Sequence, residues 1–328
     1  MHVLILGAAG MIGRKLTERL LRDGRLGGKE ITKLTLHDVV MPTVTGSVTI
    51  PIDASASDFA LSGAAEKLIA ERPDTIFHLA AIVSGEAEAD LEKGYRINLD
   101  GTRFLLDAIR NAGDGYKPRV VFTSSIAVFG APFPQAIGDE YFHTPLTSYG
   151  TQKAMGELML ADYSRRGFMD GVGIRLPTIC VRPGKPNKAA SGFFSNIIRE
   201  PLSGAEAVLP VSEDVRHWHA SPRSAIGFLV HAATMDTGVL GARRNLSMPG
   251  LSATVGEQIA ALERVAGANV VKRIRREPDP VIMKIVEGWP RNFDVREARK
   301  VGFDTAEKTF DDIVRLHIDD ELGGKFAA

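Results

Sequence analysis

The chain has 328 residues, of which 44% are hydrophobic and 24% are charged, the balance of an ordinary soluble globular protein. This length suffices for one large α/β domain or for two modest domains. Forty basic residues cancel forty acidic ones, so no net charge favours nucleic acid or an anionic membrane as partner.

The single cysteine, Cys180, excludes an intrachain disulfide and a multi-thiolate metal site. It lies in an apolar stretch, and we interpret it as a small buried residue. No apolar run reaches the roughly 18 residues that a membrane-spanning helix requires. Residues 2–6 lack a basic start and are followed at once by glycines, so we interpret them as a strand of a cytoplasmic protein rather than as a secretory leader.

Strand and helix patterns alternate over residues 1–178. Short runs of apolar residues predict strands at residues 3–6, 34–37, 48–50, 75–79, 120–124 and 173–176. Helical spacing predicts helices at residues 11–21, 60–69, 86–112 and 149–165. Strands that alternate with helices imply a parallel sheet with right-handed crossovers, so we expect an α/β fold with a Rossmann-type doubly wound sheet.

The second half of the chain is broken up by prolines and glycines, and its elements are shorter. Helices are predicted at residues 224–233, 254–266 and 310–322, and Thr254 with Glu257 forms a capping box for the second of these. We expect a nucleotide-binding domain over residues 1–178 and a smaller, mixed α/β substrate-binding domain over residues 179–328. Residues from about 211 to 247 are expected to pack partly back on the first domain.

A glycine-rich turn, with Gly7, Gly10 and Gly13, joins the first predicted strand to the first predicted helix. The first glycine permits a tight turn, the second lets a pyrophosphate approach the backbone, and the third lets helix and strand pack closely. Met11 and Ile12 open the helix, whose free N–H groups and partial positive charge attract phosphate. The turn therefore predicts a dinucleotide site.

Two aspartates follow the next predicted strands. Asp38 ends the second strand, where a carboxylate can accept hydrogen bonds from both ribose hydroxyls and would repel a 2′-phosphate. No arginine follows it, so NAD is favoured over NADP as cofactor. Asp53, after the predicted third strand, is placed to reach the adenine amino group or serves as a turn or helix-capping residue; both interpretations stay open.

Tyr149 and Lys153 are four residues apart and share one face of a predicted helix. A phenol with a pKa near ~10 is a poor base at neutral pH, but a nearby ammonium and a cationic nicotinamide ring both favour the phenolate. Ser125 stands at the end of the strand predicted from residue 120, and its hydroxyl is placed to orient the reacting oxygen. The three residues predict a catalytic group at the carboxyl edge of the sheet.

Several segments together resemble the extended short-chain dehydrogenase/reductase superfamily, of the NAD-dependent epimerase/dehydratase type. These segments are Gly7-Ala8-Ala9-Gly10-Met11-Ile12-Gly13, His78-Leu79-Ala80-Ala81, Asn98 with Gly101-Thr102, Thr123-Ser124-Ser125-Ile126-Ala127-Val128-Phe129-Gly130 and Tyr149-Gly150-Thr151-Gln152-Lys153. The resemblance covers residues 1–178. It implies that Ser125, Tyr149 and Lys153 are catalytic and that Tyr149 and Lys153 also contact the cofactor.

The resemblance also implies further roles around the cofactor. Leu79, Ala80 and Ala81 would line it, Asn98 would support the edge of the active site, and Pro177 would lie against the nicotinamide. A homodimer is implied as well, through helices near residues 95–109 and 149–159.

The substrate region departs from the nucleotide-sugar enzymes of this group. Thr178 stands where those enzymes usually have asparagine, and Pro222-Arg223 displaces an expected aspartate. Residues 175–194 instead resemble the D-erythronate dehydrogenase branch, which implies oxidation of a four-carbon sugar acid at C2 with NAD as acceptor. Paired N–H groups of arginine match a carboxylate, so we expect a cationic pocket for a small acid, with these candidate residues: Thr178, Arg182, Lys188, Arg216 and Arg223.

His217 and His219 flank Trp218 but have no third ligand nearby, so no metal is expected. We interpret one of the two histidines as a donor in the substrate pocket and assign His219. The leading hypothesis is an NAD-dependent dehydrogenase of a small hydroxy acid with Tyr149 as general base. The alternatives are a nucleotide-sugar epimerase similar to UDP-glucose 4-epimerase and a non-catalytic NAD-sensing protein.

Overall fold

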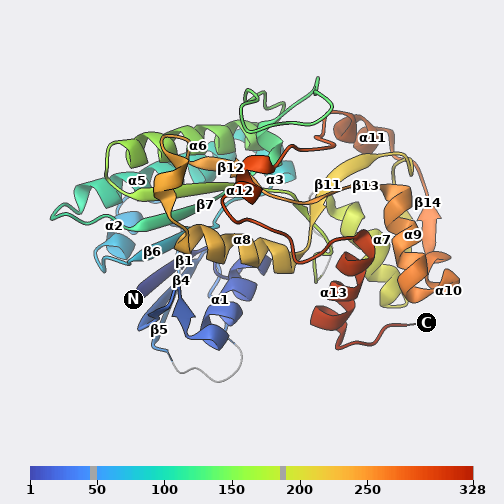
Figure 1. Cartoon of the computed structure of the whole chain (residues 1–328), viewed down its shortest axis with the longest axis horizontal. Coiled ribbons are helices and arrows are strands. Elements are labelled where there is room, and N and C mark those ends of the chain that lie inside the picture. Colours follow the sequence, from blue (N-terminus) through green and yellow to red (C-terminus); the bar gives the residue numbers. More distant parts are fainter. Residues whose placement is uncertain (45–49, 185–189, 328) are drawn as a thin grey trace.

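A seven-stranded parallel sheet organises the first part of the chain in the computed structural model, which describes residues 1–44, 50–184 and 190–327 (Figure 1). The strand order is β12-β8-β7-β6-β1-β4-β5, and every neighbouring pair is parallel. The strands are β1 (His2–Leu6), β4 (Lys33–Asp38), β5 (Ile52–Ala56), β6 (Thr75–His78), β7 (Arg119–Ser125), β8 (Asp170–Leu176) and β12 (Asn245–Ser247). The prediction of a Rossmann-type α/β fold is confirmed.

The third predicted strand was misplaced. The prediction at residues 48–50 falls mainly on residues outside the described part of the chain, and Ile50 itself lies in a bend. The observed strand β5 is Ile52–Ala56, at the edge of the sheet, with four of its five residues exposed. Because successive side chains of a strand point to opposite faces, both faces of this edge strand are exposed over residues 53–56. Such a strand needs no apolar run, so hydrophobicity does not reveal it.

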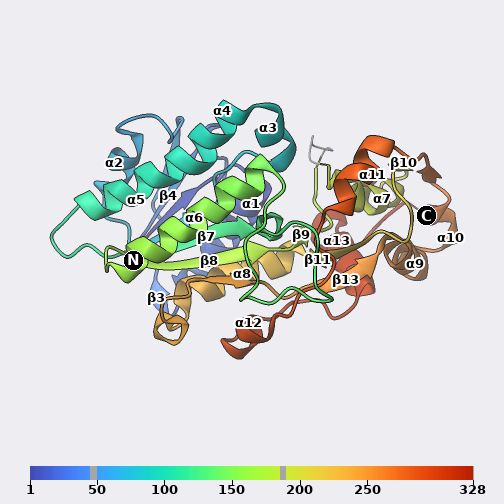
Figure 2. The ribbon, with the colours of Figure 1, turned by 90° about the horizontal axis from the view of Figure 1, so that it is seen from above.

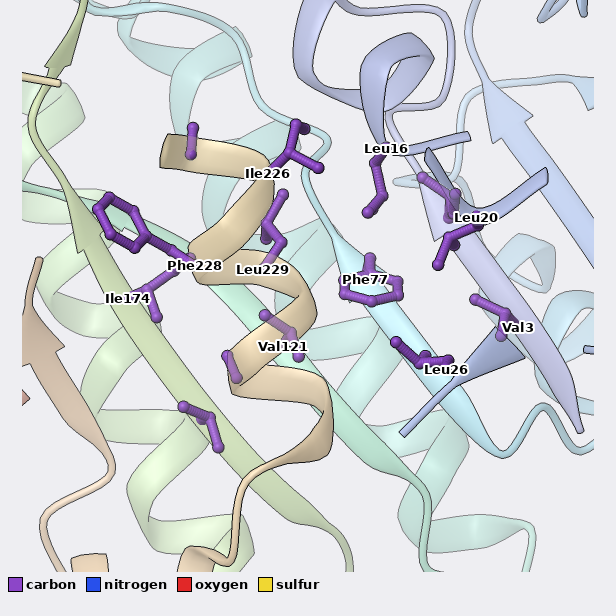
Figure 3. Packing of buried hydrophobic residues seen from close by; sticks show 14 of the residues in the cluster. Val3, Leu16, Leu20, Leu26, Phe77, Val121, Ile174, Ile226, Phe228 and Leu229 are labelled. Carbon is purple, nitrogen blue, oxygen red and sulfur yellow. The ribbon is translucent and has the colours of Figure 1, made fainter. Parts of the chain in front are cut away.

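Helices cover both faces of the sheet (Figures 1 and 2). One face packs against α1 (Met11–Asp23) and α8 (Pro222–Thr234), and the other against α2 (Ala64–Ile69), α5 (Gly101–Asn111) and α6 (Ser148–Arg165). Figure 3 shows the first of these cores, with Leu16 and Leu20 of α1 and Ile226 and Leu229 of α8 over the sheet. The segment that holds α8 and β12 therefore returns to the sheet from late in the chain.

The helix predicted over residues 86–112 is not continuous. It consists of α3 (Ser84–Ala89), α4 (Leu91–Gly94), a π-helix (Tyr95–Asp100) and α5. Asp90 separates the first two pieces, because its backbone is extended and its side chain caps α4 by accepting from Lys93 N. An aspartate that caps a new helix competes with continuation of the preceding one.

A second hydrophobic core is built only from residues after 179 and includes Cys180, which is fully buried as expected. The strands outside the main sheet are β9 (Thr178–Ile179), β11 (Arg216–Ala220), β13 (Leu251–Thr254), β10 (Ala207–Leu209) and β14 (Ile274–Arg276), with a hairpin of β2 (Arg25–Leu26) and β3 (Lys29–Glu30). The remaining helices are α7 (Gly192–Leu202), α9 (Val255–Ala266), α10 (Ala268–Val271), α11 (Pro280–Glu287), α12 (Arg296–Lys300), α13 (Phe310–Leu322) and the short 3₁₀ turns Ile126–Val128 and Thr237–Leu240.

The predicted capping box of Thr254 and Glu257 is present at the start of α9, and the helix predicted at residues 310–322 is confirmed. In the described residues, no helix combines the length and hydropathy of a membrane span. The same residues contain no group of three or more His, Cys, Asp or Glu side chains arranged to hold a metal ion.

Candidate active site

A pocket of about 290 Å³ opens at the carboxyl edge of the main sheet, between that sheet and the second core. Its described wall contains side chains from three strand ends, from the start of α6 and from the segment at residues 288–290. The residues that line the pocket include Ile12, Leu79, Ala81, Ser124, Ser125, Tyr149, Lys153, Pro177, Thr178, Arg182, His217, Trp289 and Pro290. Ligands of open parallel sheets bind at this edge.

The glycine turn is packed as tightly as a dinucleotide site requires. The neighbouring backbone leaves no space for a side chain at its glycines. Gly7 has a positive φ of 87°, and a Cβ there would lie 2.7 Å from Ala80 N. A Cβ at Gly13 would lie 2.2 Å from the Gly7 carbonyl oxygen. Helix α1 therefore begins directly against β1, with its N-terminal N–H groups toward the edge where phosphate is expected.

We expect Gly13→Ala to lower stability by about 1–3 kcal/mol, because the added methyl overlaps the turn, and to weaken NAD binding. Thermal unfolding and fluorescence titration with NAD measure the two effects. Gly227→Ala in α8 is the matched control, since nothing lies within 4 Å of its added Cβ. Wild-type NAD affinity in Gly13→Ala would contradict the assigned role of the turn.

Asp38 lies where a ribose ligand is expected. Its carboxylate accepts from Ala9 N at 2.9 Å and from Val39 N at 2.7 Å, so it joins the glycine turn to the end of β4. The placement of Asp53 needs correction: it lies inside β5 opposite Thr35, three residues before the strand ends, and forms an ion pair with Lys33 at 2.6 Å. Because β5 extends beyond the predicted strand, Asp58 is the aspartate that follows it.

Ser125, Tyr149 and Lys153 line the same pocket. Ala127 N donates to the Ser125 hydroxyl oxygen at 3.1 Å, and hydrogen bonding by Ser125 to the Tyr149 phenol is one cause that lowers the pKa of that phenol. The Lys153 ammonium donates to the Thr123 carbonyl at 2.9 Å and lies 5.7 Å from the centre of the Tyr149 ring. Thr147 caps α6 by accepting from Gly150 N, which fixes the helix start and with it the phenol.

The electrostatics differ from the expectation for Tyr149. Burial raises the pKa of its phenol, and a hydrogen bond from Ser125 and the charge of Arg182 offset this only in part. Burial also lowers the pKa of Lys153 to about 8, against the opposing charge of Glu157. In the protein alone, the charge of Arg182 favours the phenolate, and a cationic nicotinamide ring would add to it.

Sequence reasoning missed a buried network behind the site. Glu157, one turn after Lys153 on α6, is fully buried and accepts from Ser124 Oγ and from Arg175 Nη2 at 2.8 Å, and its carboxylate lies 3.1 Å from His143 Nε2. Burial opposes ionisation, but the charge and hydrogen bonds of Arg175 and His143 lower the pKa of Glu157 below its usual value. The sequence signal was a lone glutamate on the helix face that carries Tyr149 and Lys153.

We expect Glu157→Gln to destabilise the protein by about 3–5 kcal/mol near neutral pH, because the Arg175 charge stays buried without its main partner. The folded pKa of Glu157 is depressed, so its stabilisation is complete above the unfolded value and is lost as pH falls through the folded pKa. Denaturant unfolding against pH measures this. Asp162→Asn, at an exposed i,i+3 pair on the same helix, is the control; equal stability losses in both variants would contradict the assignment.

The substrate side of the pocket contains Thr178, Arg182 and His217. Thr178 Oγ1 lies 2.7 Å from His217 Nε2. The Arg182 guanidinium donates to the Ile179 carbonyl at 3.2 Å, and the described residues offer it no carboxylate partner. Burial lowers the pKa of Arg182, but an arginine remains charged in proteins. Pro177, also in the wall, lies beside Thr178 at the end of β8.

Three other candidates do not reach the pocket and are corrected. Arg216 donates to the Ser252 carbonyl at 3.0 Å and pairs with Glu257 on the face of β11 opposite to His217, because side chains alternate along a strand. Arg223 pairs with Asp320 at the surface. His219 is fully buried against Gln258, so His217 is the histidine of the pocket wall. Lys188 lies outside the described residues.

The remaining cofactor candidates lie around the same edge. Leu79 and Ala81 line the pocket, while Ala80 packs against the core behind them. Asn98 is buried in the π-helix and exchanges two hydrogen bonds with the backbone of Ile82, with Ile82 N donating at 2.9 Å. Asn98 therefore contacts the loop that forms the wall rather than the pocket itself.

Comparison with known proteins agrees with this geometry. The model of the NAD dependent epimerase/dehydratase family matches residues 3–221. D-Erythronate dehydrogenase from Cupriavidus necator is 44% identical over 98% of each chain. D-Erythronate dehydrogenase from Haemophilus influenzae is 40% identical over 98% of this chain and all of that protein.

Solved structures agree as well. The crystal structure described as the nucleoside-diphosphate-sugar epimerase from Agrobacterium tumefaciens superimposes with a TM-score of 0.97 at 66% identity, over 99% of this chain and 95% of that one. L-Threonine 3-dehydrogenase from Trypanosoma brucei, 24% identical over 99% of both chains, shares the fold with a TM-score of 0.85. The chain therefore belongs to the NAD dependent epimerase/dehydratase family and is an NAD-dependent oxidoreductase.

Proposed function

We propose that this protein oxidises D-erythronate at C2 to 2-dehydro-D-erythronate, with NAD as acceptor and Tyr149 as general base. The observation that carries the proposal is the charge of the pocket. Its described wall contains two cations, Lys153 and Arg182, and no acidic side chain. Arg182 is half-buried and has no carboxylate partner among the described residues, so its guanidinium favours a carboxylate ligand, which it can hold by two parallel hydrogen bonds.

The size of the pocket favours a small acid over a nucleotide sugar. About 290 Å³ must hold the nicotinamide end of the cofactor together with the substrate. The family also contains relatives named for nucleotide-sugar chemistry, including the Agrobacterium tumefaciens protein. The two D-erythronate dehydrogenases match this chain over nearly its full length, and their named substrate is the small anion that the pocket suits.

In the proposed reaction each group has one task. Arg182 holds the substrate carboxylate and so fixes C2 beside Tyr149. The Tyr149 phenolate accepts the proton of the C2 hydroxyl, and Ser125 holds that oxygen by a hydrogen bond as it becomes a carbonyl. NAD⁺, when bound between the glycine turn and Pro177, would supply the acceptor for the hydride of C2. The hydroxy acid loses one hydride from C2 and one proton from its hydroxyl, and the products are one 2-keto acid, one NADH and one proton released to water.

We propose that Gly7, Gly10 and Gly13 with the first N–H groups of α1 hold the pyrophosphate, and that Asp38 accepts from the adenosine ribose. Leu79, Ala81 and Pro177 would enclose the nicotinamide, and Lys153 would bind its ribose. The lysine then fixes the ring next to the phenol, and the apolar wall excludes water from the reacting carbon.

The test is a comparison of D-erythronate with a UDP-hexose, each incubated with purified protein and NAD. The proposal predicts that NADH absorbance accumulates with D-erythronate in proportion to a 2-keto acid. No NADH with the acid, together with conversion of the UDP-hexose to its epimer, would support the alternative of a nucleotide-sugar epimerase.

We also propose a cytoplasmic homodimer, formed through helices near residues 95–109 and 149–159. Exposed apolar side chains on and beside α6 support this, with Met155 at 39%, Leu158 at 64% and Leu91 at 57% exposure. Light scattering after size exclusion should give twice the mass of the 35.4 kDa chain. A single-chain mass at micromolar concentration would contradict the dimer.

A further inference from the structure

One wall of the pocket is a chain of hydrogen bonds through three residues from distant parts of the sequence. Thr178 Oγ1 on β9 lies 2.7 Å from His217 Nε2 on β11, and His217 Nδ1 lies 2.8 Å from the carbonyl oxygen of Pro290. The imidazole stacks on Phe194 with ring centres 5.2 Å apart and an angle of 2°, and Trp289 lies 5.3 Å away. The two aromatic rings and the strand leave His217 only 3% exposed.

The direction of each hydrogen bond follows from the chemistry of the atoms. A carbonyl oxygen can only accept, so Nδ1 of His217 must carry a proton and donate to Pro290. Burial lowers the pKa of His217 to about 4, so the ring is neutral and has no second proton. Nε2 therefore accepts, and the hydrogen that it accepts is that of the Thr178 hydroxyl.

The Thr178 oxygen is left with lone pairs and no hydrogen of its own to offer. Thr178 is half-buried and lines the same pocket as Arg182, and no donor to its oxygen is found in the part of the chain that the structure describes. A ligand group placed against this oxygen must supply the hydrogen. A hydroxyl satisfies that requirement, whereas a phosphate or carboxylate oxygen would set acceptor against acceptor.

We propose that Thr178 is a specificity-determining residue whose oxygen, fixed as an acceptor by His217 and Pro290, selects substrates with a hydroxyl at C3 or C4. This inference rests on the proposed function, because Ser125 and Tyr149 are assigned to the C2 hydroxyl and Arg182 to the carboxylate. It adds that the substrate group that meets Thr178 must be an uncharged hydrogen-bond donor. Acids with a phosphate or second carboxylate at that position are excluded.

The experiment compares kcat/KM for D-erythronate with that for its 3-deoxy and 4-deoxy analogues. For wild-type protein, one of the two deletions should lower kcat/KM at least tenfold, because a buried acceptor is left without a partner. In Thr178→Val, which keeps the shape but has no acceptor, the same deletion should cost less than about threefold. Thr178→Ser restores the acceptor and should recover the wild-type ratio.

Thr178→Ala serves as the second variant if valine disturbs the packing of β9, and it should show the same loss of discrimination as valine. Equal discrimination in wild type and Thr178→Val, with normal oxidation of D-erythronate, would overturn this inference and leave the proposed function intact. No oxidation of D-erythronate by the wild type would overturn both. If Thr178→Val loses the preference for D-erythronate over the deoxy analogue and Thr178→Ser regains it, the result would support the role of the Thr178 oxygen as a fixed acceptor.

Discussion

Replacement of Tyr149 by phenylalanine should lower kcat for D-erythronate by about 10²–10⁴-fold, the range that a positioned acid/base group contributes. The capped start of α6 places the phenol in the pocket wall that also contains Ser125. Removal of its oxygen leaves the pocket shape and the glycine turn in place, so the dissociation constant for NAD should change little. Steady-state kinetics and an NAD titration measure the two quantities.

Tyr163→Phe is the matched control for this variant. Tyr163 lies on the same helix, its hydroxyl donates to Asp107 at 2.7 Å, and it packs in the core away from the pocket. It should keep wild-type kcat. Unchanged turnover in Tyr149→Phe would refute the general-base assignment, and a parallel loss of NAD binding would show that the phenol supports the cofactor instead.

The second large effect is expected for Arg182→Met, which removes the proposed carboxylate ligand. Loss of a buried charged partner costs about 2–5 kcal/mol of transition-state binding, roughly 30- to 5,000-fold in kcat/KM, and most of it should appear in KM. Arg182→Lys should retain part of the activity, since an ammonium has the charge but not the planar fork.

The preference for an acid provides a readout that misfolding cannot imitate. Wild type should prefer D-erythronate over its uncharged amide, and Arg182→Met should lose that preference. Arg216→Met is the control, because Arg216 is bound to Ser252 and Glu257 outside the pocket. If Arg182→Met kept the wild-type preference for the acid, the carboxylate would have to be bound elsewhere.

The sequence predicts most strands of the sheet, the turn at Gly7 and the helix that carries Tyr149 and Lys153, because each of these depends on local rules. A buried parallel strand reads as an apolar run, and a helix brings residues four apart to one face. Strand β5 was misplaced because its side chains are exposed, and this error carried Asp53 to the wrong end of the strand.

The substrate wall was harder to predict, because residues far apart in the chain form it. Arg182 and Arg216 look equivalent in the sequence, and only the fold shows that one faces the pocket and the other pairs with Glu257. His217 and His219 lie on the same face of β11, so alternation could not decide between them. The decisive neighbour is Pro290, 73 residues after His217.

The most direct test of the account follows the hydrogen at C2. D-Erythronate with deuterium at C2 should transfer that deuterium to NAD, so that the NADH formed contains one deuterium and the 2-keto acid contains none from C2. The reaction should also slow if hydride transfer limits the rate. NADH without deuterium, or deuterium retained in an epimerised product, would contradict oxidation at this carbon.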